Sequence, residues 1–278
     1  MEKLQGKTRK SAPVGVIDIG SGFIQLKIAI QNEGKLVSIL ESVTKSLAIG
    51  RETFSEGRIS PAMMRELMSD CQVDFALHLD HGNSLALAKK CITSGFTSVM
   101  FDGSAMSFED NIKYTKEVVD YALRMDVSVE GELGTIGGKE EGDTDMEASY
   151  TKVSEAEEFV RRTNVSTLAI GVGTAHGVYK GEPEINVQRI KEIHDAIETP
   201  LVLHGASGLS DEVLRDCITA GISKINFATE LRQAYTNGIK AEFAKDPEVF
   251  DPKIYMRGAV DAIKEVIREK IKICYGIE

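Results

Sequence analysis

The order of short apolar runs along residues 71–278 constrains the fold more than any other feature. Six such runs alternate with longer stretches that have the periodicity of amphipathic helices. This alternation predicts βαβ units, in which helices join buried parallel strands. We expect strands at 75–79, 98–101, 127–133, 168–172, 201–204 and 224–227, and helices at 84–93, 108–124, 153–163, 187–197, 211–220, 229–244 and 252–273.

All six predicted strands lead into polar side chains at their carboxyl ends. In a (β/α)8 barrel the chemistry lies at that face, with contributions from many strands. An open, doubly wound sheet would instead concentrate its site near one switch point. We therefore expect an α/β chain with a TIM (β/α)8-type barrel over residues 71–278. Six units are two fewer than a closed barrel needs. The strand ends carry Asp80, Asp102, Glu132, His176, His204 and Asn226.

The first 70 residues follow a different pattern. An apolar strand reaches Asp18, a Gly-Ser-Gly turn follows at 20–22, and alternating strands are expected at 23–30 and 36–43. This pattern predicts a β-hairpin. We expect a segment that contains this hairpin to stand in place of the first two βα units. The Gly-Ser-Gly turn is either a plain hairpin turn or a place where backbone N–H groups meet a phosphate.

Composition narrows the range of partners and compartments. The formal net charge of −10 argues against general nucleic-acid binding, although it allows a local basic pocket for a phosphorylated substrate. No apolar run approaches the ~20 residues of a membrane span, and residues 1–12 are basic and polar, unlike a secretory signal. Four widely spaced cysteines fit free thiols, so we expect a cytoplasmic protein without a membrane partner.

Three of the five histidines each lie beside a glycine at a strand end. Three histidine ligands and an open position form a catalytic zinc site. The alternative is three unrelated polar residues in loops, but their corresponding positions on parallel strands favour a metal. We expect His78 to lie inside the barrel and His194 on a helix surface. The proposed ligands are His81, His176 and His204.

Carboxylates accompany these histidines. Asp80 directly precedes His81, so the two side chains reach one site only if the strand has already turned at His81. A carboxylic acid there could transfer a proton, while a metal that polarises a carbonyl would favour an enediolate. Asp102 and Glu132 are either ligands of a second cation or carboxylates that serve a helix cap or loop.

Two loops of small residues lead into helices near the end of the chain. Small residues let backbone N–H groups approach an anion, and a helix N-terminus favours it. If two strands precede Phe75, these loops follow strands seven and eight, where barrels commonly bind phosphate. Such loops are also common where no anion binds. The loops are 205–208 and 226–229.

Taken together, residues 72–274 resemble class II, metal-dependent fructose-bisphosphate and tagatose-bisphosphate aldolases. The stretches that resemble the family are 76–82, 98–104, 127–134, 173–177, 203–208 and 224–229. The resemblance implies cleavage of a ketose 1,6-bisphosphate by a zinc-dependent dimer or tetramer, with a monovalent cation near the phosphate. It implies Asp80 as proton donor, and Asp102 and Glu132 at a second metal position. The residues that the resemblance places around dihydroxyacetone phosphate are Gly177, Gly205, Ala206, Ser207, Asn226, Phe227, Ala228 and Thr229.

The front of the chain resembles a different family, the exopolyphosphatase branch of the actin-like ATPases. The resembling stretches are 18–22, 47–51 and 57–60. We therefore expect a chimera, joined near Asp70 and Cys71, that lacks the family's first two βα units and their contacts to the second phosphate. Three functions follow: an active aldolase for the fructose or tagatose substrate, an impaired protein that binds zinc and phosphate, or a polyphosphate hydrolase led by Asp18 and Ser21.

Overall fold

The structure is a computed structural model. It describes the backbone of 15–20, 23–32 and 35–40, and then residues 76–138, 149–179 and 181–277. The chain divides into two compact units, residues 1–77 and residues 78–278, and each is taken by itself.

The first unit contains an antiparallel three-stranded sheet. Strands β1 (Gly15–Gly20), β2 (Phe23–Asn32) and β3 (Lys35–Leu40) follow one another in the order β1-β2-β3. Strands β1 and β2 pair from Gly15 with Ile28 to Gly20 with Phe23, so the predicted hairpin is confirmed. The stretches 47–51 and 57–60 that resemble exopolyphosphatases lie outside the described residues, and the chimera stays a prediction.

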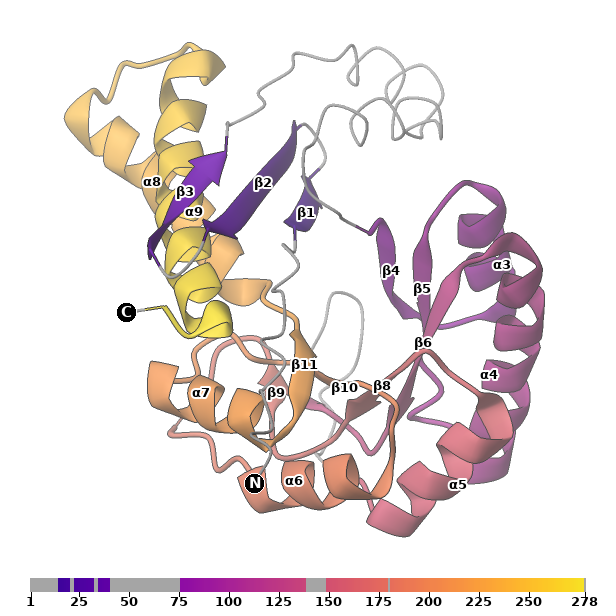
Figure 1. Ribbon diagram of the computed structural model, residues 1–278. Helices are drawn as coiled ribbons and strands as arrows, with labels where there is room; N and C mark the ends of the chain where they lie inside the picture. Colours follow the sequence, from indigo (N-terminus) through magenta and orange to yellow (C-terminus); the bar gives the residue numbers. More distant parts are fainter. Residues whose placement is uncertain are drawn as a thin grey trace. The chain divides into compact units, whose positions relative to one another are not determined.

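The second unit is a parallel six-stranded sheet, curled into a half-barrel with helices on its outer side (Figure 1). This confirms the α/β, TIM-barrel-type prediction. Among the described residues, β4 and β11 form the two edges, and the strand order is β11-β10-β8-β6-β5-β4. The sheet and its helices are β4 (His78–Gly82), α3 (Leu85–Thr93), β5 (Ser98–Phe101), α4 (Phe108–Ala122), the 3-10 turn η1 (Leu123–Met125), β6 (Ser128–Leu133), α5 (Val153–Thr163), β8 (Thr167–Ile170), α6 (Val187–Ala196), β10 (Leu201–Leu203), α7 (Asp211–Ala220), β11 (Ile222–Ile225), α8 (Thr229–Lys245) and α9 (Pro252–Tyr275).

Most helix boundaries lie within two residues of those predicted, because local capping determines them. Ser84, Ser107 and Ser210 each accept a hydrogen bond from a backbone N–H in the first turn of the helix that follows. Such caps satisfy donors that have no partner within the helix. Strand β4 begins three residues later than predicted and extends through the polar stretch to Gly82. A further short pair, β7 (Gly137–Gly138) and β9 (Ala175–His176), was not predicted.

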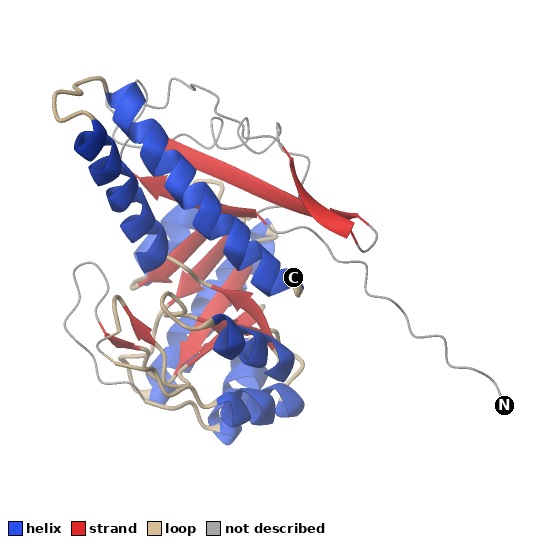
Figure 2. Ribbon diagram, turned by 90° about the vertical axis from the view of Figure 1, so that its left-hand side faces the viewer, coloured by secondary structure: helices blue, strands red, loops and turns tan. Residues whose placement is uncertain are grey.

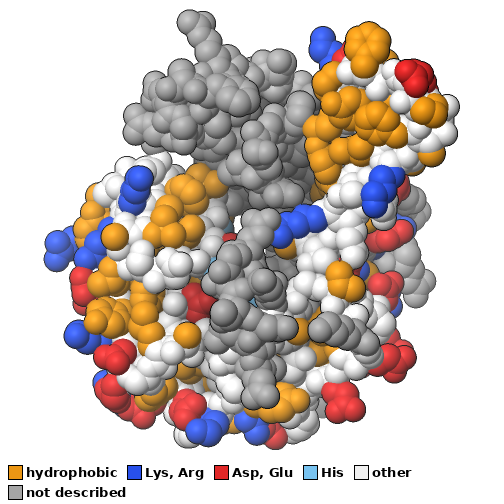
Figure 3. Space-filling model, turned by 180° about the vertical axis from the view of Figure 1, so that it is seen from behind, with side chains coloured by type: hydrophobic (Ala, Val, Ile, Leu, Met, Phe, Trp, Pro, Cys, Tyr) orange, Lys and Arg blue, Asp and Glu red, His pale blue; other side chains and the backbone are white. Residues whose placement is uncertain are grey.

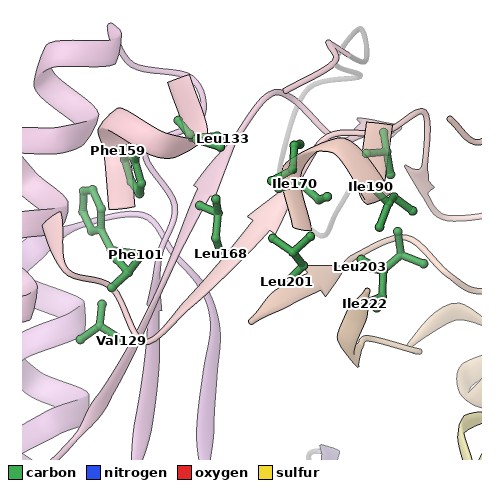
Figure 4. Close-up of a cluster of buried hydrophobic side chains, with 14 of the residues drawn as sticks. Phe101, Val129, Leu133, Phe159, Leu168, Ile170, Ile190, Leu201, Leu203 and Ile222 are labelled. Atoms are coloured by element: carbon green, nitrogen blue, oxygen red, sulfur yellow. The ribbon is translucent and has the colours of Figure 1, made fainter. Parts of the chain in front are cut away.

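The main core lies between the sheet and the helices. Side chains alternate between the two faces of each strand, so Leu168 and Ile170 point outward and meet apolar residues from helices such as Phe159 and Ile190 (Figure 4). A smaller apolar cluster faces inward and consists of Met100, Ala169 and Val202. The inner face of the sheet is therefore only partly apolar, which leaves room for polar side chains.

Helices α8 and α9 form an antiparallel hairpin at the end of the chain (Figure 2). A Cβ at Gly238 would lie 2.6 Å from the Cα of Ala259, so the two helices approach closely there. Apolar side chains gather over the tip of the hairpin, where Phe250 is 89% exposed and Ile254 54% exposed (Figure 3). No helix in the described part of the chain has both the length and the apolar character needed to cross a membrane.

Candidate active site

A β-bulge brings Asp80 and His81 to the same side of β4. Leu79 pairs with Val99 and Gly82 pairs with Phe101, so Asp80 and His81 together oppose the single residue Met100. His81 has a left-handed backbone with φ of 49°, which is uncommon for a residue with a side chain. On the sequence alone, Asp80 and His81 could reach one site only if the strand turned at His81. The bulge provides this turn, because it places two residues opposite one.

The structure brings His81, His176 and His204 together from three strand ends. Their ring centroids are 4.9, 4.6 and 6.1 Å apart, and each pair of rings is nearly perpendicular. Nε2 of His81 lies 2.8 Å from Nδ1 of His204. One nitrogen from each ring lies within 4.8 Å of the others, so the three can hold one metal ion.

In two of these rings, the nitrogen that points away from the other histidines is hydrogen-bonded to a carboxylate. Nδ1 of His81 lies 2.9 Å from Oδ2 of Asp102, and Nε2 of His204 lies 2.7 Å from Oε1 of Glu130. An ionised carboxylate only accepts hydrogen bonds, so each ring donates through that nitrogen. The lone pairs of the other two nitrogens then face each other. Three imidazoles arranged in this way fit Zn²⁺, which is commonly bound by histidines that donate to carboxylates.

The electrostatics of the site favour a neutral imidazole at His176. Burial, reinforced by the neighbouring His81 and His204, lowers the pKa of His176 to about 4. Burial alone would raise the pKa of Asp102, but hydrogen bonds from His81 and Ser104 outweigh it and lower that pKa to about 2. At neutral pH His176 is therefore deprotonated, as a metal ligand must be.

A second group of possible ligands shares His81. Nδ1 of His81, Asp102 and Glu132 together offer ligand atoms within 4.8 Å of one another. Oε2 of Glu132 is buried without a hydrogen-bond partner in the described part of the chain and lies 3.9 Å from Nδ1 of His81. Burial, together with the nearby charge of Asp102, raises the pKa of Glu132 well above its usual range. A bound cation would reverse that effect, because positive charge favours the carboxylate.

Asp80 lies beside the histidines without joining their cluster. Its side chain is 50% exposed, and Oδ1 lies 3.9 Å from Nδ1 of His204. Oδ1 also accepts a hydrogen bond of 3.0 Å from Nδ2 of Asn226. Asp80 is therefore held near the proposed metal position while its carboxylate stays accessible to a substrate.

The two predicted phosphate loops are hydrogen-bonded to each other. Oγ of Ser207 accepts hydrogen bonds from the backbone N–H groups of Ala228, at 3.2 Å, and Glu230, at 3.3 Å. Ser207 thereby satisfies the first turn of α8, which begins at Thr229. Gly205 has a φ of 65°, and a Cβ there would lie 2.7 Å from the carbonyl oxygen of Ala175. The loop around Gly205 therefore packs closely against the loop that carries His176 and Gly177.

The structure also places the other residues that were singled out in the sequence. Ala206 is fully buried, and the ammonium of Lys270 lies 5.3 Å from the centre of the Phe227 ring. His78 lies on the inner side of β4, where Nδ1 is 2.8 Å from Oγ of Ser98. His194 is exposed on α6, as predicted.

Three neighbours of the site were not assigned from the sequence: Glu130, Lys224 and Tyr179. Glu130 and Glu132 are two residues apart on one strand, so the alternation of a strand was the signal that both face inward. Lys224 faces inward only because of a local irregularity in β11. The Tyr179 hydroxyl accepts from the N–H of Ala175 and donates to the carbonyl of Gly205, a connection that follows from loop geometry alone.

Comparison with known proteins gives consistent results. Residues 38–277 match the family described as fructose-bisphosphate aldolase class-II. The crystal structure of the YdjI aldolase from Escherichia coli K12 is similar, with 39% identity and a TM-score of 0.66 over 77% of this chain and 74% of that chain. A putative fructose-1,6-bisphosphate aldolase from Coccidioides immitis is 28% identical, with a TM-score of 0.68 over 77% of this chain and 76% of its own.

A third similar structure supports the fold alone. Fructose-bisphosphate aldolase from Campylobacter jejuni has 21% identity and a TM-score of 0.65, over 78% of this chain and 75% of that chain. The family match begins at residue 38, ahead of the join that was expected near Asp70 and Cys71.

Proposed function

Because the chain belongs to the class II fructose-bisphosphate aldolase family, we propose that it is a zinc-dependent enzyme that reversibly cleaves fructose 1,6-bisphosphate. The products are dihydroxyacetone phosphate and glyceraldehyde 3-phosphate. The observation that carries this proposal is the convergence of three imidazoles beside Asp80, with Nε2 of His81 2.8 Å from Nδ1 of His204. Tagatose 1,6-bisphosphate, which differs in configuration at C4, is the alternative substrate of the same reaction.

The residues that would hold the metal are His81, His176 and His204. When bound, zinc supplies a Lewis acid that polarises the ketose carbonyl and so favours the enediolate that cleavage of the C3–C4 bond produces. Asp102 and Glu130 keep two of the ligand rings oriented through hydrogen bonds to their far nitrogens. Asp102 and Glu132 offer a second divalent position, which Nδ1 of His81 would join only in place of its hydrogen bond to Asp102.

Asp80 is proposed as the acid and base of the reaction. Cleavage requires a base to take the proton of the C4 hydroxyl, whose oxygen becomes the aldehyde oxygen of the second product. In the direction of synthesis the same group returns this proton, so Asp80 is the proton donor. The hydrogen bond from Asn226 leaves one carboxylate oxygen of Asp80 available for this transfer.

The loops at Gly205–Ser207 and Asn226–Thr229 are proposed to bind the phosphate of dihydroxyacetone phosphate, with Gly177 beside them. Support comes from their contact with each other and from the N-terminus of α8, which favours an anion. A monovalent cation beside that phosphate would balance part of its charge in a chain of net charge −10. The proposed partner is thus a phosphorylated sugar. The proposed compartment of the protein is the cytoplasm.

We also propose that the enzyme is a dimer or tetramer. The apolar tip of the α8–α9 hairpin supports this, because Phe250 and Ile254 are exposed there and Phe243 is 39% exposed. Exposed apolar patches of this kind often mark contacts between subunits.

An impaired protein that binds zinc without turnover is the second candidate. One observation favours it: within the described ranges, the parallel sheet ends at β4 and β11 after six strands. A coupled assay of bisphosphate cleavage on folded, zinc-loaded protein separates the two candidates.

Replacing the proposed acid tests the assignment directly. We expect Asp80→Ala to bind one equivalent of zinc but to lose at least about 100-fold in kcat, which is the lower range for general acid–base catalysis. Asp195→Ala, on the outer helix α6, is the control and should keep full activity. Full activity of Asp80→Ala would exclude this role for Asp80.

A further inference from the structure

We propose that Lys224 is a positioning residue for the metal site, and that it acts through Glu130 on the orientation of His204. The proposal rests on the proposed zinc function and adds Lys224 to it, behind the Glu130 carboxylate that orients His204. The contacts of Lys224 and Glu130 form a continuous path from strand β11 to a proposed ligand.

A β-bulge turns Lys224 toward the interior of the half-barrel. Leu201 pairs with Ile222 and Val202 pairs with Lys224, so Ser223 is an extra residue in β11. Without this residue, Lys224 would share the outward face with Ile222, which packs in the main core. The bulge instead places Lys224 opposite the inward-facing Val202, as bulges commonly re-aim side chains near active sites.

Glu130 connects Lys224 to His204 across the inner face. Its Oε2 accepts from Nζ of Lys224 at 2.9 Å, and its Oε1 accepts from Nε2 of His204 at 2.7 Å. Strand β8 lies between the strands that carry these groups. Its inward residues along this path are Thr167, which pairs with Glu130, and the small Ala169, which pairs with Val202.

The contact with Lys224 explains how the carboxylate of Glu130 can be buried. Only 1% of the Glu130 side chain is exposed. A buried charge is costly unless a counter-charge and hydrogen bonds compensate it. Lys224 supplies the counter-charge, and Oγ1 of Thr167 adds a weaker hydrogen bond of 3.3 Å to Oε2.

The consequence for His204 is a single tautomer. Because an ionised Glu130 only accepts, Nε2 of His204 carries the hydrogen and Nδ1 presents its lone pair. That lone pair faces Nε2 of His81, where the metal is proposed. Losing Lys224 removes the group that holds Glu130 in place, so His204 is no longer restricted to this tautomer and rotation.

Zinc affinity and the tautomer of His204 test the proposal. Zinc affinity is measured by competition with a chromophoric chelator, and the tautomer by ¹⁵N NMR of histidine-labelled, metal-free protein. We expect Lys224→Met to weaken zinc binding about 10- to 100-fold, the range typical of groups that orient metal ligands. Its His204 signals should show a mixture of tautomers, whereas Lys224→Arg should restore both properties nearly to those of the wild type.

Two further variants separate positioning from general stability. Lys89→Met breaks an ion pair of similar length, 2.6 Å to Glu117 on the outer helices, and should leave zinc affinity unchanged. Glu130→Gln should weaken zinc binding as Lys224→Met does. Adding Lys224→Met to Glu130→Gln should cause no further loss, because Lys224 acts only through Glu130.

Several results would overturn the inference. Wild-type zinc affinity and a single His204 tautomer in folded Lys224→Met would do so, and additive losses in the double variant would show that Lys224 acts by another route. If Lys224→Met does not fold, unchanged zinc affinity in Glu130→Gln decides against the proposal. Failure of the wild-type protein to bind zinc would instead refute the proposed function itself.

Discussion

Acid should destabilise the metal-free protein through His78. Burial, together with the positive charge of Lys224, lowers the pKa of His78 to about 4 from an ordinary value of 6.5. Between these two pH values, His78 is therefore neutral in the folded protein but protonated in the unfolded chain. As the pH falls from about 6.5 to about 4, protons bind the unfolded state preferentially, and the stability present above this window is lost.

The size of the effect follows from the pKa difference. Each pH unit corresponds to about 1.4 kcal/mol, so the difference between 6.5 and about 4 gives a loss of about 3 kcal/mol. The side chain is only 15% exposed, so solvent screens it little. Below about pH 4 both states are protonated, and His78 should cause no further loss.

Urea unfolding of the wild type and of His78→Gln measures this effect. A chelator must be present throughout, because zinc binding is itself linked to pH. The free energy of unfolding of the wild type minus that of the variant should be about 3 kcal/mol larger at pH 7.5 than at pH 4. Groups common to both proteins cancel in this difference. A stability difference that stays constant over this range would refute the assignment of a neutral, buried His78.

Other substitutions test the packing and the loops. Gly131→Val should destabilise the protein by about 1–3 kcal/mol in urea unfolding, because overpacking strains a core and a Cβ at Gly131 would lie 2.8 Å from the Phe159 ring; an unchanged midpoint would contradict this. Tyr179→Phe removes both hydrogen bonds that connect Ala175 to Gly205. Steady-state kinetics should show KM for the bisphosphate raised about 5- to 10-fold with a smaller change in kcat, and equal KM values would show that the connection is unimportant.

Local sequence signals predicted most of the elements, because their causes are local. Helix α5 was predicted at 153–163 and is observed at Val153–Thr163, and α7 likewise begins and ends where the serine cap and the following glycine indicate. Strand β4 was placed too early, since its apolar residues suggested an end at Leu79. Its ladder with β5 instead continues through the polar residues to Gly82.

The candidate site was predictable in its residue types but not in its detailed geometry. Glycine neighbours and strand-end positions indicated that His81, His176 and His204 would meet. The bulges that aim His81 and Lys224 inward depend on pairing with neighbouring strands, which a single sequence does not reveal. Asn226, expected near the phosphate, also donates a hydrogen bond to Asp80, a contact that the sequence did not indicate.

Cleavage of fructose 1,6-bisphosphate by the purified chain, before and after removal of zinc, tests the central claim most directly. A coupled assay for glyceraldehyde 3-phosphate should detect no cleavage after dialysis against a chelator, and full recovery when one equivalent of zinc is returned. Tagatose 1,6-bisphosphate, assayed in parallel, identifies the preferred substrate. Undiminished cleavage by zinc-free protein, or no cleavage of either sugar by folded and zinc-loaded protein, would contradict the account.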